Sequence, residues 1–131
     1  MVLVRVFLGL LALGWLAFGV LCFTDPEFIR DAAGVSWISP TGLVDVRATY
    51  GGIQTAVAVA LLAGAINPHL TRGVLMMYGL ICAGLGSARL IAAVQTAEWS
   101  SYTRIGVGFE LGCVLLVLIL LHRARTVPQH K

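Results

Sequence analysis

Three apolar stretches of this sequence contain residues that could do chemistry. The stretch VDVRATYGGIQTAVAVALLAGAIN carries Arg47, Tyr50 and Gln54 just before its apolar run, and two later stretches contain Arg89 and Glu110. A carboxylate can act as an acid or base, a guanidinium group binds anions, and a phenol donates a hydrogen bond. These residues could therefore bind an anionic ligand or catalyse a proton transfer, provided that the fold brings them together.

The composition indicates what kind of fold must position them. Of the 131 residues, 59% are hydrophobic and 11% are charged, whereas soluble domains have about 45–50% and about 25%. The mean hydropathy is +0.93, so a soluble fold would expose large apolar patches. The formal charge of +3 comes from scattered basic residues, which does not indicate nucleic-acid binding. The chain is therefore predicted to be a single integral membrane domain over residues 1–131.

Four stretches are long enough to cross a bilayer core, which needs about 20 apolar residues of helix. The predicted spans are approximately residues 2–23, 44–66, 73–94 and 103–122, followed by a frayed basic tail over 123–131. The apolar run of the first span is longer than the ~7–15 residues of a signal peptide, and no A-x-A cleavage site follows it. We therefore predict an all-α, four-transmembrane-helix bundle in which the first span is retained.

The basic residues favour one orientation of this bundle. Five of them lie on the side of the two termini: Arg5, Arg72, Arg123, Arg125 and Lys131. Only Arg30 and Arg104 lie in the opposite loops. Because Lys and Arg concentrate in cytoplasmic loops, both termini are predicted to be cytoplasmic. Trp37, Trp99 and Tyr102 would then form part of an aromatic belt at the outer surface.

The loop between the first two spans has the signals of a short helix. In TDPEFIRDAAG, Thr24 or Asp25 could cap a helix over Pro26–Ala33, and Gly34 would end it. This helix is expected to lie on the outer membrane surface or to cap the bundle, unless the segment is a plain connector without a role.

Helical geometry places the polar residues of the second span together. At 100° per residue, Arg47, Tyr50, Gly51 and Gln54 fall on one stripe. Asp45 points about 200° away from Arg47 and is expected to cap this helix instead. Arg47 is therefore predicted to face whatever Gln54 faces, and lipid is a poor partner for both.

The same polar level recurs in the third and fourth spans. At about 1.5 Å per residue, Tyr50 lies ~9 Å, Glu110 ~10 Å and Arg89 ~7 Å from the outer end of its span. A charge at the bilayer centre costs about 2.5–3.5 kcal/mol, so these groups are expected to face the bundle interior. The predicted ligand-binding site in the outer half of the bilayer has five residues: Arg47, Tyr50, Gln54, Arg89 and Glu110.

The charges of this predicted site do not balance. Two arginines and one glutamate leave a formal +1, which Asp31, Glu98 or an anionic ligand such as a lipid phosphate could neutralise. The alternative is that Arg89 and Glu110 form a structural ion pair that fixes the register of two helices and binds nothing.

Two further features concern packing. Cys22, Cys82 and Cys113 lie one per segment without a C-x-x-C motif, so they are predicted to be buried structural thiols, and neither a metal site nor a cofactor is expected.

Gly108 and Gly112 form a G-x-x-x-G motif on the face away from the predicted site. That face is predicted to pack against the first helix or against a protein partner, including a second copy of this chain.

At DVRATYGGIQ the chain resembles a group of small bacterial membrane proteins, the domain-of-unknown-function 4345 family. The residues that carry the resemblance are Arg47, Ala48, Tyr50, Gly51 and Gly52, then Arg89 and Glu110. Asp45 stands where the family pattern has glutamate. The resemblance covers nearly the whole chain. It implies a four-helix protein of the bacterial inner (cytoplasmic) membrane with these site residues, but it implies no reaction.

Three functions are compatible with these residues. We predict that the chain binds an anionic amphiphile, such as a membrane lipid, or serves as an accessory subunit of a membrane complex. The first alternative is an enzyme for isomerisation, hydration or epoxide opening of a lipophilic substrate. Glu110 would be its acid or base, Tyr50 its hydrogen-bond donor, and the arginines would hold an anion. The second alternative is a small proton-coupled exporter, although two nearby arginines would oppose protonation of Glu110.

Overall fold

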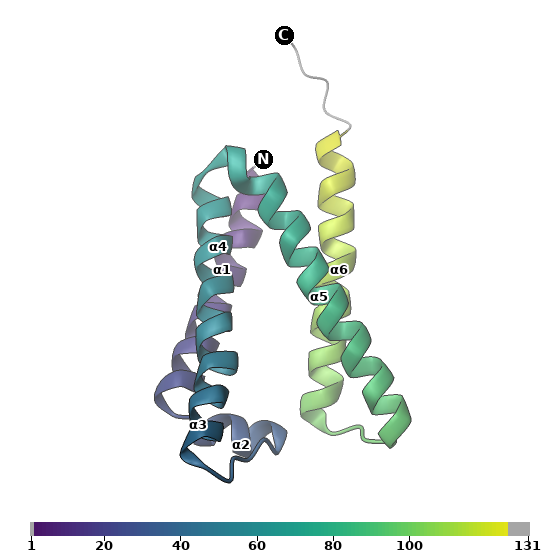
Figure 1. Cartoon of the computed structure of the whole chain (residues 1–131). Coiled ribbons are helices and arrows are strands. Elements are labelled where there is room, and N and C mark those ends of the chain that lie inside the picture. The colour runs from purple at the N-terminus through teal and green to yellow at the C-terminus, as the bar shows by residue number, and fades with distance from the viewer. Residues whose placement is uncertain (1, 126–131) are drawn as a thin grey trace.

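The computed structural model describes residues 2–125, and every regular element in that part of the chain is a helix (Figure 1). In chain order the elements are α1 (Val2–Thr24), α2 (Glu27–Ala33), α3 (Pro40–Val46), the π-helix η1 (Arg47–Ile53), α4 (Gln54–Ile66), α5 (Pro68–Thr96) and α6 (Ser101–Arg125). Because α3, η1 and α4 follow one another without a break, they form one long helix.

Within residues 2–125, four helices are long and apolar enough to cross a membrane. They are Val2–Thr24, Pro40–Ile66, Pro68–Thr96 and Ser101–Arg123. The prediction of an all-α fold with four spans is therefore confirmed. Helix α6 extends into the predicted tail as far as Arg125, and residues 126–131 of that tail lie outside the described residues.

The second span begins earlier than predicted because its start signal lies at Ser39. The Ser39 hydroxyl accepts a hydrogen bond from the backbone N–H of Gly42 (3.1 Å), and Pro40 occupies the first helical position. Asp45 is an exposed residue inside α3. The prediction that Asp45 caps this helix is therefore wrong.

The connection between α4 and α5 is a single residue, Asn67, so α5 begins before the predicted residue 73. The Asn67 side chain caps α5 by accepting a hydrogen bond from the backbone N–H of His69 (3.0 Å). Arg5 of α1 supports the same turn, because its Nε donates to the carbonyl of Ala65 (2.6 Å) and its Nη2 to that of Ile66 (3.2 Å). A cation thus satisfies the carbonyl end of α4, where the helix dipole is negative.

The short helix predicted between the first two spans is α2, and it packs against the bundle. It ends as predicted at Gly34, whose φ of 71° lies in the left-handed region. The predicted cap is wrong, because the Thr24 hydroxyl donates to backbone oxygens of α1 and no side chain caps α2. Ile29 is fully buried with Cys22 and Val46, a group called here the α2 cluster. Because α2 also contacts α6, it links α1 with the last helix.

The long helices form two antiparallel pairs (Figure 1). Helix α1 packs along α4 and α5 packs along α6, while α4 and α5 meet near their shared turn. The two pairs diverge away from this turn, and α2 lies at the divergent end. One core nevertheless joins them, with residues from each long helix: Val4, Leu8, Ala12, Val57, Leu61, Leu75, Tyr78, Cys82, Cys113, Val117 and Leu120.

Tyr78 is the polar centre of this core. Its side chain is fully buried, its hydroxyl accepts a hydrogen bond from Nε1 of Trp15 (3.1 Å), and it donates to Sγ of Cys113 (3.5 Å). The Trp15 and Tyr78 rings meet edge to face with their centroids 6.1 Å apart. One hydroxyl thus links α1, α5 and α6. All three cysteines are buried and free, as predicted.

Replacing Tyr78 with phenylalanine is expected to lower the free energy of unfolding by about 1 kcal/mol, because the partly buried Trp15 N–H loses its acceptor. Tyr50→Phe is the matched control, since the Tyr50 hydroxyl makes no hydrogen bond to residues 2–125. Unfolding in mixed micelles of SDS and dodecylmaltoside, followed by circular dichroism, measures both variants. Equal losses in the two would contradict the role given to the Tyr78 hydroxyl.

Candidate functional site

Arg89 of α5 and Glu110 of α6 form a bidentate ion pair. Arg89 Nε donates to Oε2 of Glu110 (3.0 Å), and Arg89 Nη2 donates to Oε1 (2.8 Å). The Glu110 side chain is 7% exposed and that of Arg89 is 28% exposed. Both carboxylate oxygens are therefore engaged, and the two charges neutralise each other within the helix pair. The structure thus brings these two predicted site residues together.

Two glycines make room for this ion pair. A Cβ atom at Gly106 would lie 2.8 Å from Nε of Arg89, and one at Gly86 would lie 3.1 Å from Cβ of Glu110. Any larger residue at either position would push α5 and α6 apart or displace a charged side chain. The close approach of these helices therefore depends on the small residues beside the charges.

Arg89 also lies over an aromatic ring that is absent from the predicted site. Its Cζ is 5.5 Å from the ring centroid of Tyr102, at a distance typical of a cation–π contact. Tyr102 and Tyr50 both pack against the α2 cluster, so Tyr50 lies in the same region as the ion pair. A signal for Tyr102 exists in the sequence, because Tyr102, Gly106 and Glu110 recur every four residues and share one helix face.

Arg47, the first residue of η1, has a different neighbour. Its Cζ lies 6.0 Å from the ring centroid of Phe23 in α1. Its Nε is buried and finds no hydrogen-bond partner within the described residues. Gln54 is half-buried, and its side chain makes no hydrogen bond to residues 2–125. The structure therefore gives neither residue a direct contact with the Arg89–Glu110 pair.

The π-helix explains why regular helix geometry does not describe this segment. Hydrogen bonds in a π-helix run from i to i+5, so its turns are wider than those of an α-helix and 100° per residue no longer holds. Gly51 lies against α1, where a Cβ atom would be 2.7 Å from Cβ of Phe23. Arg47 and Gly51 thus both approach Phe23, which orients this part of η1 toward α1. Such π-helical turns are frequent at functional sites.

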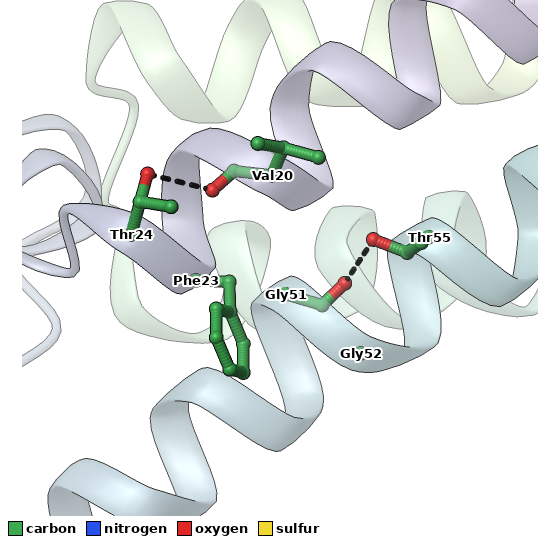
Figure 2. A pocket seen from close by; sticks show the side chains of 6 residues that line it. All are labelled: Val20, Phe23, Thr24, Gly51, Gly52 and Thr55. Atoms are coloured by element: carbon green, nitrogen blue, oxygen red, sulfur yellow. Dashed lines mark hydrogen bonds between the residues drawn. The ribbon is translucent and has the colours of Figure 1, made fainter.

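A groove opens beside Phe23 between α1 and η1 (Figure 2). Its volume is about 340 Å³, and it is lined by Val20, Phe23, Thr24, Gly51, Gly52 and Thr55. The hydroxyls of both threonines are already used, because Thr24 donates to the carbonyl of Val20 (2.9 Å) and Thr55 to that of Gly51 (2.8 Å). The groove therefore offers mainly hydrocarbon surface to a ligand.

The two loop carboxylates that could balance the site charge are engaged elsewhere or lie apart from it. Asp31 pairs with the neighbouring arginine of α2 (3.3 Å). Glu98 is exposed and makes no ion pair among residues 2–125. Since Glu110 neutralises Arg89, the charge that the described residues leave without a counter-ion in the predicted site is that of Arg47.

The G-x-x-x-G face of α6 is not covered by another part of the described chain. A Cβ atom at Gly108 or Gly112 would meet nothing within 4 Å. The first helix therefore does not pack there, and a protein partner on this face stays a prediction. Among residues 2–125 no three His, Cys, Asp or Glu residues lie close enough together to hold a metal ion.

These features define a small helical protein with four helices that are long and apolar enough to span a membrane, an ion pair between α5 and α6, and an arginine at the contact between η1 and α1 that residues 2–125 leave unpaired. The chain belongs to the domain-of-unknown-function 4345 family, DUF4345, whose model matches residues 3–121. The resemblance seen in the sequence is thereby confirmed. No curated protein and no solved structure matches the chain. Its function therefore rests on the geometry of the site.

Proposed function

We propose that this protein binds an anionic amphiphile, such as an anionic membrane lipid, through Arg47. The observation that carries the proposal is the buried Nε of Arg47, which has no hydrogen-bond partner within the described residues. Charged groups inside membrane proteins normally pair with an opposite charge or face a polar site. A phosphate group supplies a negative charge and several hydrogen-bond acceptors to one guanidinium group.

The depth of Arg47 supports a lipid headgroup as the source of that phosphate. Arg47 precedes Ile66, the last residue of α4, by at most about 28 Å at the 1.5 Å per residue of an α-helix, and by somewhat less because η1 is a π-helix. The hydrocarbon core of a bilayer is about 30 Å thick, so Arg47 and Ile66 lie near its opposite faces. A lipid phosphate at that level reaches the guanidinium group without leaving the headgroup region. With cytoplasmic termini, this lipid belongs to the outer leaflet.

The contacts of Glu110 favour binding over the alternatives. An enzyme with Glu110 as acid or base, or an exporter with Glu110 as proton carrier, needs a carboxylate whose oxygens can reach a substrate. Both Glu110 oxygens accept hydrogen bonds from Arg89, so both are already engaged within the protein. Contact with a substrate would require this pair to open. We therefore place the ligand at Arg47 and give the Arg89–Glu110 pair a structural role.

Native mass spectrometry from nanodiscs of equal parts phosphatidylglycerol and phosphatidylcholine tests this proposal. Wild-type protein is expected to retain phosphatidylglycerol in preference to phosphatidylcholine. In Arg47→Gln this preference is expected to fall about tenfold, because a hydrogen bond to a charged group contributes about 1.5 kcal/mol or more. Arg104→Gln is the control, since it removes an equal charge from an exposed arginine of α6. It is expected to keep the wild-type preference.

Two results would contradict the proposal. An unchanged lipid preference in Arg47→Gln would mean that the anion is held elsewhere or not at all. An equal loss in Arg47→Gln and Arg104→Gln would mean that the preference follows the net charge of the protein rather than a site at Arg47.

A further inference from the structure

The two neighbouring glycines of η1 differ in their surroundings. A Cβ atom at Gly51 would collide with α1, at 2.7 Å from Cβ and 3.0 Å from Cα of Phe23. A Cβ atom at Gly52 would meet nothing within 4 Å, although Gly52 lines the groove between α1 and η1. Gly51 therefore allows the helices to touch, whereas Gly52 leaves the groove open beside that contact (Figure 2).

Phe23 connects this groove with Arg47. Its ring lies under the Arg47 guanidinium at 6.0 Å, and the same side chain lines the groove. An apolar surface therefore continues directly into the place where an unpaired positive charge lies. A lipid has the complementary arrangement, with a negative headgroup at one end of its hydrocarbon chain.

We infer that the groove between α1 and η1 holds the first part of an acyl chain of an anionic lipid whose headgroup binds Arg47, and that Gly52 provides the room for that chain. This inference rests on the proposed function. It adds where the acyl chain of the lipid lies and which residue determines the width of the groove. The lining residues support an acyl chain because both lining hydroxyls are used within their own helices. The occupant is one of the surrounding lipids, since Val20, Phe23 and Gly52 are exposed on the surface of the bundle.

The expected contribution of the groove is moderate. An acyl chain that moves from the bilayer into the groove gains no hydrophobic free energy, because the bilayer is equally apolar. It gains close packing with the groove wall, so blocking the groove removes dispersion contacts and changes binding by about fivefold. Loss of Arg47 acts on the headgroup instead and changes the preference for anionic over zwitterionic lipid.

Photo-crosslinking tests the inference with a defined lipid. The probe is a phosphatidylglycerol with a diazirine in the upper part of one acyl chain, incorporated into phosphatidylcholine nanodiscs with the full-length protein. Wild-type protein is expected to be labelled at Val20, Phe23 and neighbouring residues of the groove. The Cβ position of Gly52 is open, so Gly52→Leu can place its side chain in the groove without a backbone collision, and it is expected to reduce this labelling about fivefold.

Two further variants make the experiment decisive. Gly108→Leu is the matched control, because a Cβ atom there also meets no described neighbour within 4 Å but lies outside the groove. It should leave the labelling unchanged. Val20→Phe narrows the same groove from α1, where Val20 is 48% exposed, and should reproduce the loss if Gly52→Leu does not accumulate as folded protein.

The outcomes separate the inference from the proposed function. If Arg47→Gln loses the preference for phosphatidylglycerol but Gly52→Leu and Val20→Phe are labelled like wild type, the inference about the chain is overturned and the proposed function stands. If wild-type protein were labelled as strongly on the exposed face of α6 as in the groove, the inference would be overturned in the same way. If Arg47→Gln also behaves like wild type, both are overturned.

Discussion

Glu110→Gln is expected to lower the free energy of unfolding by about 3–5 kcal/mol, the range for removing one partner of a buried ion pair. Glutamine keeps the volume of the side chain but leaves the Arg89 charge without its counter-ion, and one of the two hydrogen bonds loses its acceptor. Arg89→Gln is expected to lose a similar amount, because Glu110 is only 7% exposed. Unfolding in mixed micelles of SDS and dodecylmaltoside measures both changes.

The double variant Arg89→Gln, Glu110→Gln shows whether Arg89 and Glu110 stabilise the fold by pairing with each other or through separate contacts. Two neutral glutamines can hydrogen-bond across the same gap, so the double variant should recover about half of the loss seen in each single variant. The exposed pair of Glu27 and Arg30 in α2 is the control. Glu27→Gln should change stability by less than about 1 kcal/mol, because exposed ion pairs contribute little. Additive losses in the double variant would contradict direct coupling between Arg89 and Glu110.

The number of spans could be predicted from the sequence because it depends on long apolar runs. Hydropathy did not locate the start of the second span, because Pro40–Leu43 is not strongly apolar. The helix begins there because of its capping residues. The serine–proline pair at Ser39 and Pro40 carries the signal, as an N-cap followed by a first-turn proline. Asp45, the residue expected to cap the helix, lies nearly two turns further on. Hydropathy thus locates a span, and the capping residues locate its end.

The Arg89–Glu110 pair could be predicted as residues at one level because α5 and α6 are regular helices there. This argument fails for Arg47, because η1 is a π-helix. The rotation per residue in a π-helix is smaller than about 100°, so the direction of Arg47 relative to Gln54 cannot be calculated from α-helical geometry. The residue that contacts Arg47 could not be predicted either, because that contact depends on how α1 packs against η1. Phe23 lies at the end of the first span and has no polar group that would mark it as part of a site.

Gly19→Ala is the prediction with the second largest expected effect on stability, a loss of about 2–3 kcal/mol. A Cβ atom at Gly19 would lie 2.7 Å from Oγ1 of Thr55, 2.9 Å from the backbone nitrogen of Thr55 and 3.0 Å from the carbonyl oxygen of Gly51. The backbone atoms cannot rotate away, so α1 must move from η1 and lose its contacts along the long helix. Gly14→Ala in the same helix is the control, because nothing lies within 4 Å of its Cβ position.

Unfolding in mixed micelles again measures the difference. Gly14→Ala should be neutral or stabilising by up to about 1 kcal/mol, since alanine favours a helix more than glycine does. If Gly19→Ala behaved like Gly14→Ala, the close approach of α1 and η1 would be contradicted.

Gly19→Ala and Glu110→Gln together separate the binding contact from the structural one. Gly19 lies one turn before Phe23 on α1, so moving α1 from η1 also shifts the ring under Arg47. Under conditions in which both variants are folded, Gly19→Ala should weaken the retention of phosphatidylglycerol, whereas Glu110→Gln should leave it at the wild-type level. The opposite pattern would place the ligand between α5 and α6. It would give the Arg89–Glu110 pair the binding role and make the contact of α1 with η1 purely structural.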